Sequence, residues 1–126
     1  MGHGYLIDTN TVIDFLNRKL PVKGKNLVMA IEPVISVITQ IELYSSDKLS
    51  VQELWDLDSF IRAATIYNYI DEQIVKHAIN IRKTYKRKTP DAIIAATALT
   101  HNLTLITRNI RDFNSIIGLD LINPWD

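Results

Sequence analysis

The chain has 126 residues, no cysteine and a formal net charge of zero, and 47% of its residues are hydrophobic. These values predict one compact domain over 1–126 and exclude disulfides, a thiolate metal site and a cysteine nucleophile. The longest stretch without Asp, Glu, Lys or Arg, residues 92–107, is too short and too polar to span a bilayer. Because the first residues also lack the pattern of a signal peptide, we expect a cytoplasmic protein.

The charges balance overall but are segregated along the chain. Residues 32–72 contain eight acidic and two basic residues, whereas residues 76–111 contain eight basic residues and one acid, Asp91. The basic segment can attract a polyanion, and a solvated helix face explains the asymmetry equally well.

Short apolar runs alternate with helix-forming segments. In chain order we expect a strand at 5–7, a helix at 9–16, a loop at 20–26, a strand at 33–38, a helix from Thr39, a helix at 51–62 capped by Ser50, a strand at 64–67, a helix from Asp71, a helix from Asp91, and strands at 103–107 and 119–122. Pro90 suits the start of a helix. The alternation predicts an α/β fold in which helices cover both faces of a parallel sheet.

Most of the chain's candidate ligands follow strands. Asp8 ends the first strand, Glu42 comes soon after the second, and Asn109 and Asp112 follow the fourth. The carboxyl ends of parallel strands meet at one edge of a sheet, where ligands gather. Asp91 joins this edge if the preceding helix returns the chain to it, because the helix from Asp91 and the next strand are antiparallel and both roughly 16–17 Å long.

Several carboxylates at one edge repel each other unless cations neutralise them. Oxygen-only ligands favour Mg²⁺ or Mn²⁺, which can deprotonate a water and stabilise the leaving oxygen of a phosphodiester. For a single acid, helix capping is the alternative, and it applies most directly to Asp91 and Glu42. The convergence of four acids favours a metal site.

Four segments, LIDTN at 6–10, IEL at 41–43, PDAIIAA at 90–96 and LITRNIRDF at 105–113, resemble the signature segments of PIN domains. They occur in order over nearly the whole chain and look most like the VapC-type toxins of toxin–antitoxin pairs. The resemblance implies a three-layer α/β/α fold with a central, mainly parallel sheet of about five strands. It also implies a Mg²⁺- or Mn²⁺-dependent endoribonuclease, a homodimer, and an inhibitory antitoxin that docks near 38–57.

Carried over by position, the resemblance implies an acidic triad that is catalytic and binds the metal: Asp8, Glu42 and Asp91. A further metal ligand falls at Asn109 or Asp112, and Asn109 can coordinate through its carbonyl oxygen but brings no charge. Asn10 and Thr107 are expected to hydrogen-bond the acids.

The basic run before Asp91 is expected to bind RNA phosphates, together with the arginine after the fourth strand. The expected RNA-binding residues are Lys83, Lys86, Arg87, Lys88 and Arg108. Tyr85 lies in this run but fits the apolar face of its helix, so packing is favoured over base stacking, and we expect packing or interface roles for Trp55 and Trp125. The histidines are expected at the surface or at caps: His3, His77 and His101.

Two alternatives stay open at the level of sequence. The first is a catalytically weak PIN-like module that binds RNA or a protein partner, and Asn109 favours it. The second is a phosphotransfer domain of the receiver or haloacid dehalogenase type, which also places an aspartate after its first strand. A dehalogenase-type phosphatase needs a second aspartate where this chain has Asn10. A receiver needs an acidic pair and a later lysine, where the chain has Asp8 alone and Arg108.

Overall fold

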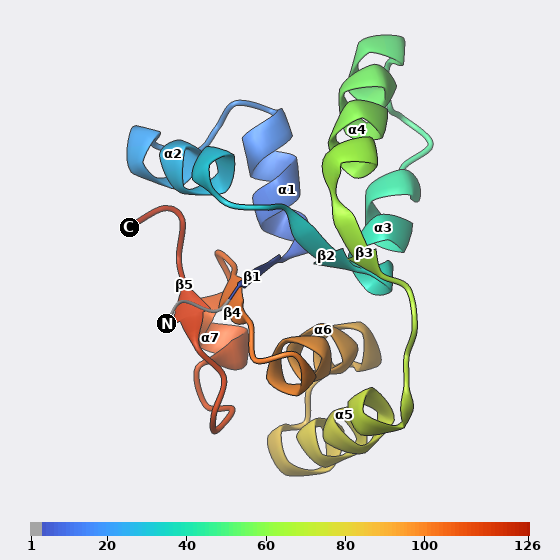
Figure 1. Ribbon diagram of the computed structural model, residues 1–126, viewed down its shortest axis with the longest axis vertical. Helices are drawn as coiled ribbons and strands as arrows, with labels where there is room; N and C mark the ends of the chain where they lie inside the picture. Colours follow the sequence, from blue (N-terminus) through green and yellow to red (C-terminus); the bar gives the residue numbers. More distant parts are fainter. Residues whose placement is uncertain (1–3) are drawn as a thin grey trace.

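The computed structural model describes residues 4–126 (Figure 1). The strands are β1 (Tyr5–Ile7), β2 (Val34–Ser36), β3 (Thr65–Tyr67), β4 (Thr104–Ile106) and β5 (Leu121–Ile122). The helices are α1 (Thr9–Leu16), α2 (Val22–Ala30), α3 (Val37–Tyr44), α4 (Val51–Ala63), α5 (Glu72–Tyr85), α6 (Thr89–Thr100) and α7 (Ile110–Phe113). Within residues 4–126, none of these helices is both long and apolar enough to cross a membrane.

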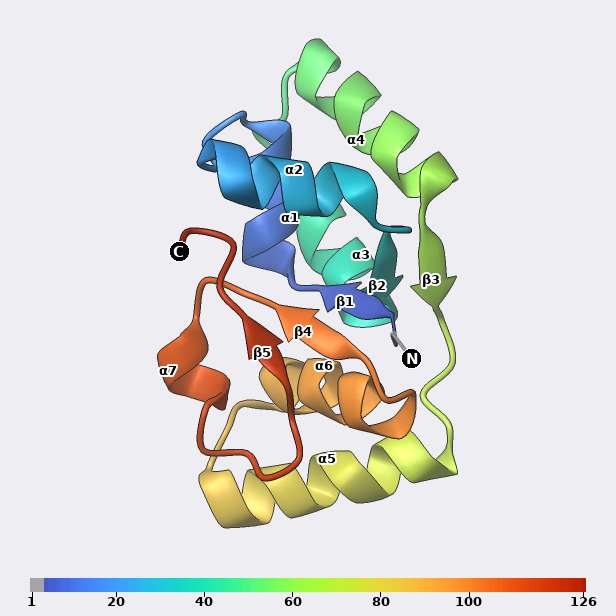
Figure 2. The ribbon, with the colours of Figure 1, turned by 60° about the vertical axis from the view of Figure 1, so that its left-hand side comes forward.

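All the paired strands run parallel. β4 lies between β1 and β5, and β2 pairs with β3. β1 also contacts β2, so the two groups of strands lie side by side (Figure 2). The prediction of about five mainly parallel strands is confirmed, although hydrogen bonds join them as a group of three and a group of two.

Alternation along the strands separates two cores. Leu6 and Leu105 belong to a cluster that includes Ile81 of α5 and several residues of α6, whereas Ile7 and Ile106 belong to a cluster with residues from α1 to α4. Successive strand residues point to opposite faces, so β1 and β4 each contribute to both cores. Figure 2 shows α5 and α6 on one side of the strands and α1 to α4 on the other. The predicted three-layer α/β/α fold is confirmed.

Local sequence signals explain where several helices begin. Ser50 and Glu53 form a capping box at α4, in which each side chain accepts a hydrogen bond from the other residue's main-chain N–H, both at 3.0 Å. Asp71 caps α5 by accepting the N–H of Ile74 at 2.9 Å. Pro90 lies in the first turn of α6, as predicted.

The second predicted strand, 33–38, is too long. The hydroxyl of Ser36 accepts the N–H of Thr39 at 3.2 Å, so α3 begins at Val37 instead of Thr39. A serine cap thus outweighs the β-branched character of the residues that follow it. The short helix α7 was also not predicted.

The loop predicted at 20–26 is wrong, because α2 occupies most of this segment. Pro21 stands at the N-cap of α2, where its missing N–H leaves no helical hydrogen bond unmade. Gly24 lies inside the helix, where a Cβ would overlap the main-chain carbonyl of Pro124. Gly24 therefore permits close packing of α2 on the C-terminal segment, and it does not mark a turn.

Replacing Gly24 with Ala is expected to lower the free energy of unfolding by about 1–3 kcal/mol, because the added methyl overpacks this contact. Urea unfolding at neutral pH measures the change. Lys23→Ala, an exposed position on the same helix turn, is the control and should change stability by less than about 0.5 kcal/mol. A stabilised Gly24→Ala protein, as expected for an unhindered helical glycine, would contradict the close packing.

Candidate functional site

The buried carboxylate of Asp8 lies where β1 ends and α1 begins. It caps α1 by accepting the N–H of Thr9 at 2.8 Å, and only 4% of the residue is exposed. β1 and β4 are parallel neighbours in register, so Thr107 follows β4 beside Asp8. The Thr107 hydroxyl donates to Oδ2 of Asp8 at 2.7 Å. Hydrogen bonds from the start of α1 and from the end of β4 therefore hold the Asp8 carboxylate in place.

Asn10 connects Asp8 to the segment that follows β4. Its Nδ2 lies 3.3 Å from both Oδ2 of Asp8 and Oγ1 of Thr107, and its Oδ1 accepts the main-chain N–H of Arg108 at 3.1 Å. The N–H of Asn109 donates to Oγ1 of Thr107 at 3.0 Å. Asn10 and Thr107 thus hydrogen-bond an acid of the predicted site, and their part in metal binding stays a prediction.

Glu42 reaches this edge from α3. Oγ1 of Thr9, the residue after Asp8, donates to Oε1 of Glu42 at 2.6 Å. The same Oγ1 lies 3.0 Å from the hydroxyl of the buried Thr39, one turn before Glu42. No local pattern predicts these hydrogen bonds, because they join residues about thirty positions apart.

Asp91 in the first turn of α6 and Asp112 in α7 lie close enough to interact electrostatically. Burial raises the pKa of the Asp91 carboxyl, and the negative charges of Asp112 and Glu42 raise it further. Arg87 and Lys88 act in the opposite direction. α5 therefore returns the chain to the edge where β1 ends, as the sequence prediction required.

Asp8 has the most strongly perturbed carboxyl of the group. Burial raises its pKa from 3.8 to about 6. Hydrogen bonds from Thr107 and Thr9 lower this pKa, and the charges of Asp91 and Glu42 raise it. The acids therefore destabilise one another's charged forms, which is the condition that a bound cation relieves.

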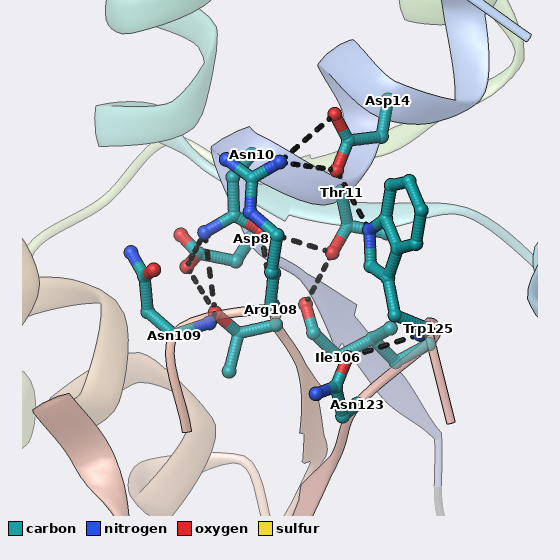
Figure 3. Close-up of polar contacts among 10 residues, drawn as sticks. Asp8, Asn10, Thr11, Asp14, Ile106, Arg108, Asn109, Asn123 and Trp125 are labelled. Carbon is teal, nitrogen blue, oxygen red and sulfur yellow. Dashed lines mark hydrogen bonds and ion pairs between the residues drawn. The ribbon is translucent and has the colours of Figure 1, made fainter. Parts of the chain in front are cut away.

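The donor chemistry of this edge fits a hard divalent cation, because its acids offer carboxylate oxygens and the chain has no cysteine to offer sulfur. Among residues 4–126, the side chains do not bring three Asp, Glu or His groups close enough together to hold a metal ion. Figure 3 shows the side-chain amide of Asn109 beside Asp8. Asp112 lies farther along α7, with its Oδ1 3.5 Å from Nη1 of Arg87.

A family model described as "PIN domain" matches residues 5–118. The chain belongs to the PIN domain family. It is 27% identical to ribonuclease VapC1 of Rickettsia felis, over 94% of this chain and 95% of that protein. It is 32% identical to the tRNA(fMet)-specific endonuclease VapC of Salmonella typhimurium, over 96% and 97% of the two chains.

Solved structures also show a similarity of fold to toxin–antitoxin proteins. A chain of a toxin–antitoxin complex from Klebsiella pneumoniae is 34% identical to this PIN domain, and its TM-score is 0.79. The match covers 98% of this chain and 99% of that one. The resemblance noted in the sequence to VapC-type PIN domains is confirmed.

The basic residues of this PIN domain differ in how they are held. Lys83, Lys86 and Lys88 are exposed around the end of α5, and Lys86 ends that helix with a left-handed backbone (φ 60°). Arg87 faces Asp112 across 3.5 Å. Arg108 instead donates from Nη1 to both carboxylate oxygens of Asp14, at 3.2 and 2.9 Å.

The structure gives specific contacts to residues that the sequence prediction missed or assigned only a general role. Asp14 was not predicted: it is buried, but its neighbours one turn away on α1, Asn10 and Thr11, are polar, so no local pattern marks it as part of a buried ion pair. Trp125 donates from Nε1 to Asp14 at 3.0 Å. His101 ends α6 and stacks on Tyr67, His77 lies 3.0 Å from the hydroxyl of Thr100, and His3 falls outside the described residues.

The raised pKa of Asp8 predicts a pH-dependent stability. The folded PIN domain binds the Asp8 proton more tightly than the unfolded chain, so its free energy of unfolding should fall as pH rises from about 4 to about 6. Asp8→Asn removes this titration and should stabilise the protein at pH 8 by about 1–3 kcal/mol. Urea unfolding at pH 4 and pH 8 with chelator tests this. Asp47→Asn, at an exposed site, is the control, and equal effects of Asp8→Asn at both pH values would refute the prediction.

Proposed function

We propose that this PIN domain is a Mg²⁺- or Mn²⁺-dependent endoribonuclease and the toxin of a toxin–antitoxin pair. The observation that carries the proposal is the electrostatic interaction among acids from four separate segments at one sheet edge: Asp8, Glu42, Asp91 and Asp112. The relatives named as ribonuclease VapC1 and as a tRNA(fMet)-specific endonuclease support a nuclease. An RNA substrate also implies action in the cytoplasm.

The acids are proposed to have different roles in binding the metal. Asp8, Glu42 and Asp91 would be the principal ligands and the catalytic residues, with Asp112 or the carbonyl oxygen of Asn109 completing the set. The ion, when bound, would supply an activated water and charge stabilisation for a phosphodiester. The chain's own contribution is to hold Asp8 rigidly by three hydrogen bonds.

The RNA would approach from the end of α5. Three exposed lysines lie around the end of α5: Lys83, Lys86 and Lys88. Lys88 is the N-cap residue of α6, and its positive charge lowers the pKa of Asp91. Arg87 contributes a charge that already lowers the pKa of Asp91. Phosphates bound at these cations would bring the RNA backbone next to the acids.

An antitoxin would cover apolar surface on the opposite side of the molecule from α5. Within the predicted region 38–57, Ile41, Val51 and Trp55 are exposed, whereas Leu43 and Leu57 belong to the core. A hollow of about 750 Å³ lies between α1, α2 and α4, with Phe15, Val22, Met29 and Phe60 among its lining residues. Its size and apolar lining suit a segment of an antitoxin, and a homodimer is proposed in addition.

The second candidate is a catalytically weak module that binds RNA or a partner. Asn109 favours it, because this amide stands beside Asp8 without the negative charge of a carboxylate. The two candidates differ in whether metal-dependent cutting of RNA occurs.

Purified protein is expected to cut RNA with added Mg²⁺ or Mn²⁺ and not with chelator. Asp8→Asn and Asp91→Asn should each lower the rate by roughly 100-fold or more, since even residues that only orient metal ligands cost 10–100-fold. Cleavage of a labelled RNA pool measures this. Asp47→Asn, a matched charge loss at an exposed site, should keep full activity. Retained RNA affinity without cutting in the wild type would favour the binding module.

Replacing Lys86, Arg87 and Lys88 together with Ala should weaken RNA binding and reduce the slope of log affinity against log salt by about 2. Binding is measured in chelator, so that no RNA is cut. The control replaces three exposed lysines near α2, Lys19, Lys23 and Lys25, and removes the same charge. If both triple variants change the slope equally, RNA contacts are not concentrated at the end of α5.

A further inference from the structure

Asp14 is a buried acid that the proposed metal site does not use. It lies on α1, is 5% exposed, and accepts hydrogen bonds from two side chains far along the chain. Nη1 of Arg108 donates to both carboxylate oxygens, and Nε1 of Trp125 donates to Oδ2 (Figure 3). A buried carboxylate persists only when charge and hydrogen bonds compensate it, so these three residues form one unit.

Arg108 connects this unit to Asp8. Its side chain is held by Asp14, while its main-chain N–H donates to Oδ1 of Asn10. Arg108 directly follows Thr107, whose hydroxyl donates to Asp8 at 2.7 Å. The contacts at both ends of Arg108 therefore restrain the main chain next to Thr107.

Trp125 brings in the C-terminal segment. β5 pairs with β4, and the N–H of Thr107 donates to the carbonyl of Ile122 at 3.0 Å. The chain then turns back, with the N–H of Trp125 donating to Oδ1 of Asn123 at 3.0 Å, and reaches Asp14. α1, the segment after β4 and the C-terminal segment thus meet at one carboxylate.

We infer that Asp14, Arg108 and Trp125 form a brace that positions Thr107, and through it the Asp8 carboxylate, for metal binding. Its three members are positioning residues, and Arg108 acts here and not as an RNA-phosphate contact. The geometry stands by itself, and the consequence for metal binding rests on the proposed function.

The first test is amide hydrogen exchange in protein free of metal and RNA. Asp14→Asn and Trp125→Phe should each speed exchange at the N–H groups of Arg108 and Asn109 by roughly tenfold, because both are held by the braced segment. Exchange at Thr104 and Leu105 in β4 should not change. Trp125→Phe keeps the Asp14–Arg108 pair, so it tests the brace even if the other variant folds poorly. Trp55→Phe, at an exposed tryptophan of α4, is the control.

The second test is Mn²⁺ affinity, which the brace variants should weaken roughly tenfold, as loss of ligand-orienting groups does. In cleavage assays, Arg108→Gln should lower kcat with little change in KM or in the salt slope of RNA binding, and Arg108→Lys should restore part of kcat. The control is Arg111→Gln, at an exposed arginine of α7. The double variant Asp14→Asn/Arg108→Gln should cost less than the two single losses combined.

Unchanged exchange and unchanged Mn²⁺ affinity would overturn the brace. It would also be overturned if Arg108→Gln reduced the salt slope by about 0.7 with kcat intact and Asp14→Asn had no effect, because Arg108 would then be a phosphate contact. A wild-type protein that binds Mn²⁺ but cuts no RNA would refute the nuclease proposal. Hydrogen exchange and Mn²⁺ affinity would then still support or overturn the brace. A wild type that binds no Mn²⁺ would refute the metal-dependent function, and exchange alone would decide the brace.

Discussion

The structure depends on a carboxylate that is buried at the junction of β1 and α1. Asp8 accepts the first N–H of α1 and the hydroxyl of Thr107, so the same group starts a helix and joins two parallel strands. Its burial raises its pKa, and the neighbouring acids add to this effect. A fold that keeps such a group ionised at neutral pH carries a cost in stability, which a bound cation would offset.

Parallel topology explains why residues from so many segments meet. Each crossover from a strand through helices to the next parallel strand returns the chain to the same side, so strand ends collect at one edge. Asp91 reaches this edge by a different path, at the start of α6 and not at the end of a strand. The antiparallel pair α5 and α6 makes this possible, since α5 carries the chain back before α6 begins.

The basic segment of the chain reaches the acids at this edge. Arg87 faces Asp112 and lowers the pKa of Asp91, so the basic segment interacts with the acids before any RNA is present. Arg108, although basic and close in space, is held by Asp14. The charge pattern of the sequence thus predicted that positive residues lie near the acids, but it did not predict which acid each of them contacts.

Local physics made much of this protein readable from its sequence. Apolar runs, caps such as Ser50, and Asp8 at the end of a strand predicted the alternation of elements and the edge where the acids meet. Long-range contacts decided the rest. Gly24 reads as a loop residue until Pro124, a hundred positions later, packs against it. Arg108 pairs with Asp14, 94 positions earlier, and no local pattern predicts this partner. Such contacts leave no periodic pattern in the chain, because they arise only when packed elements bring distant residues together.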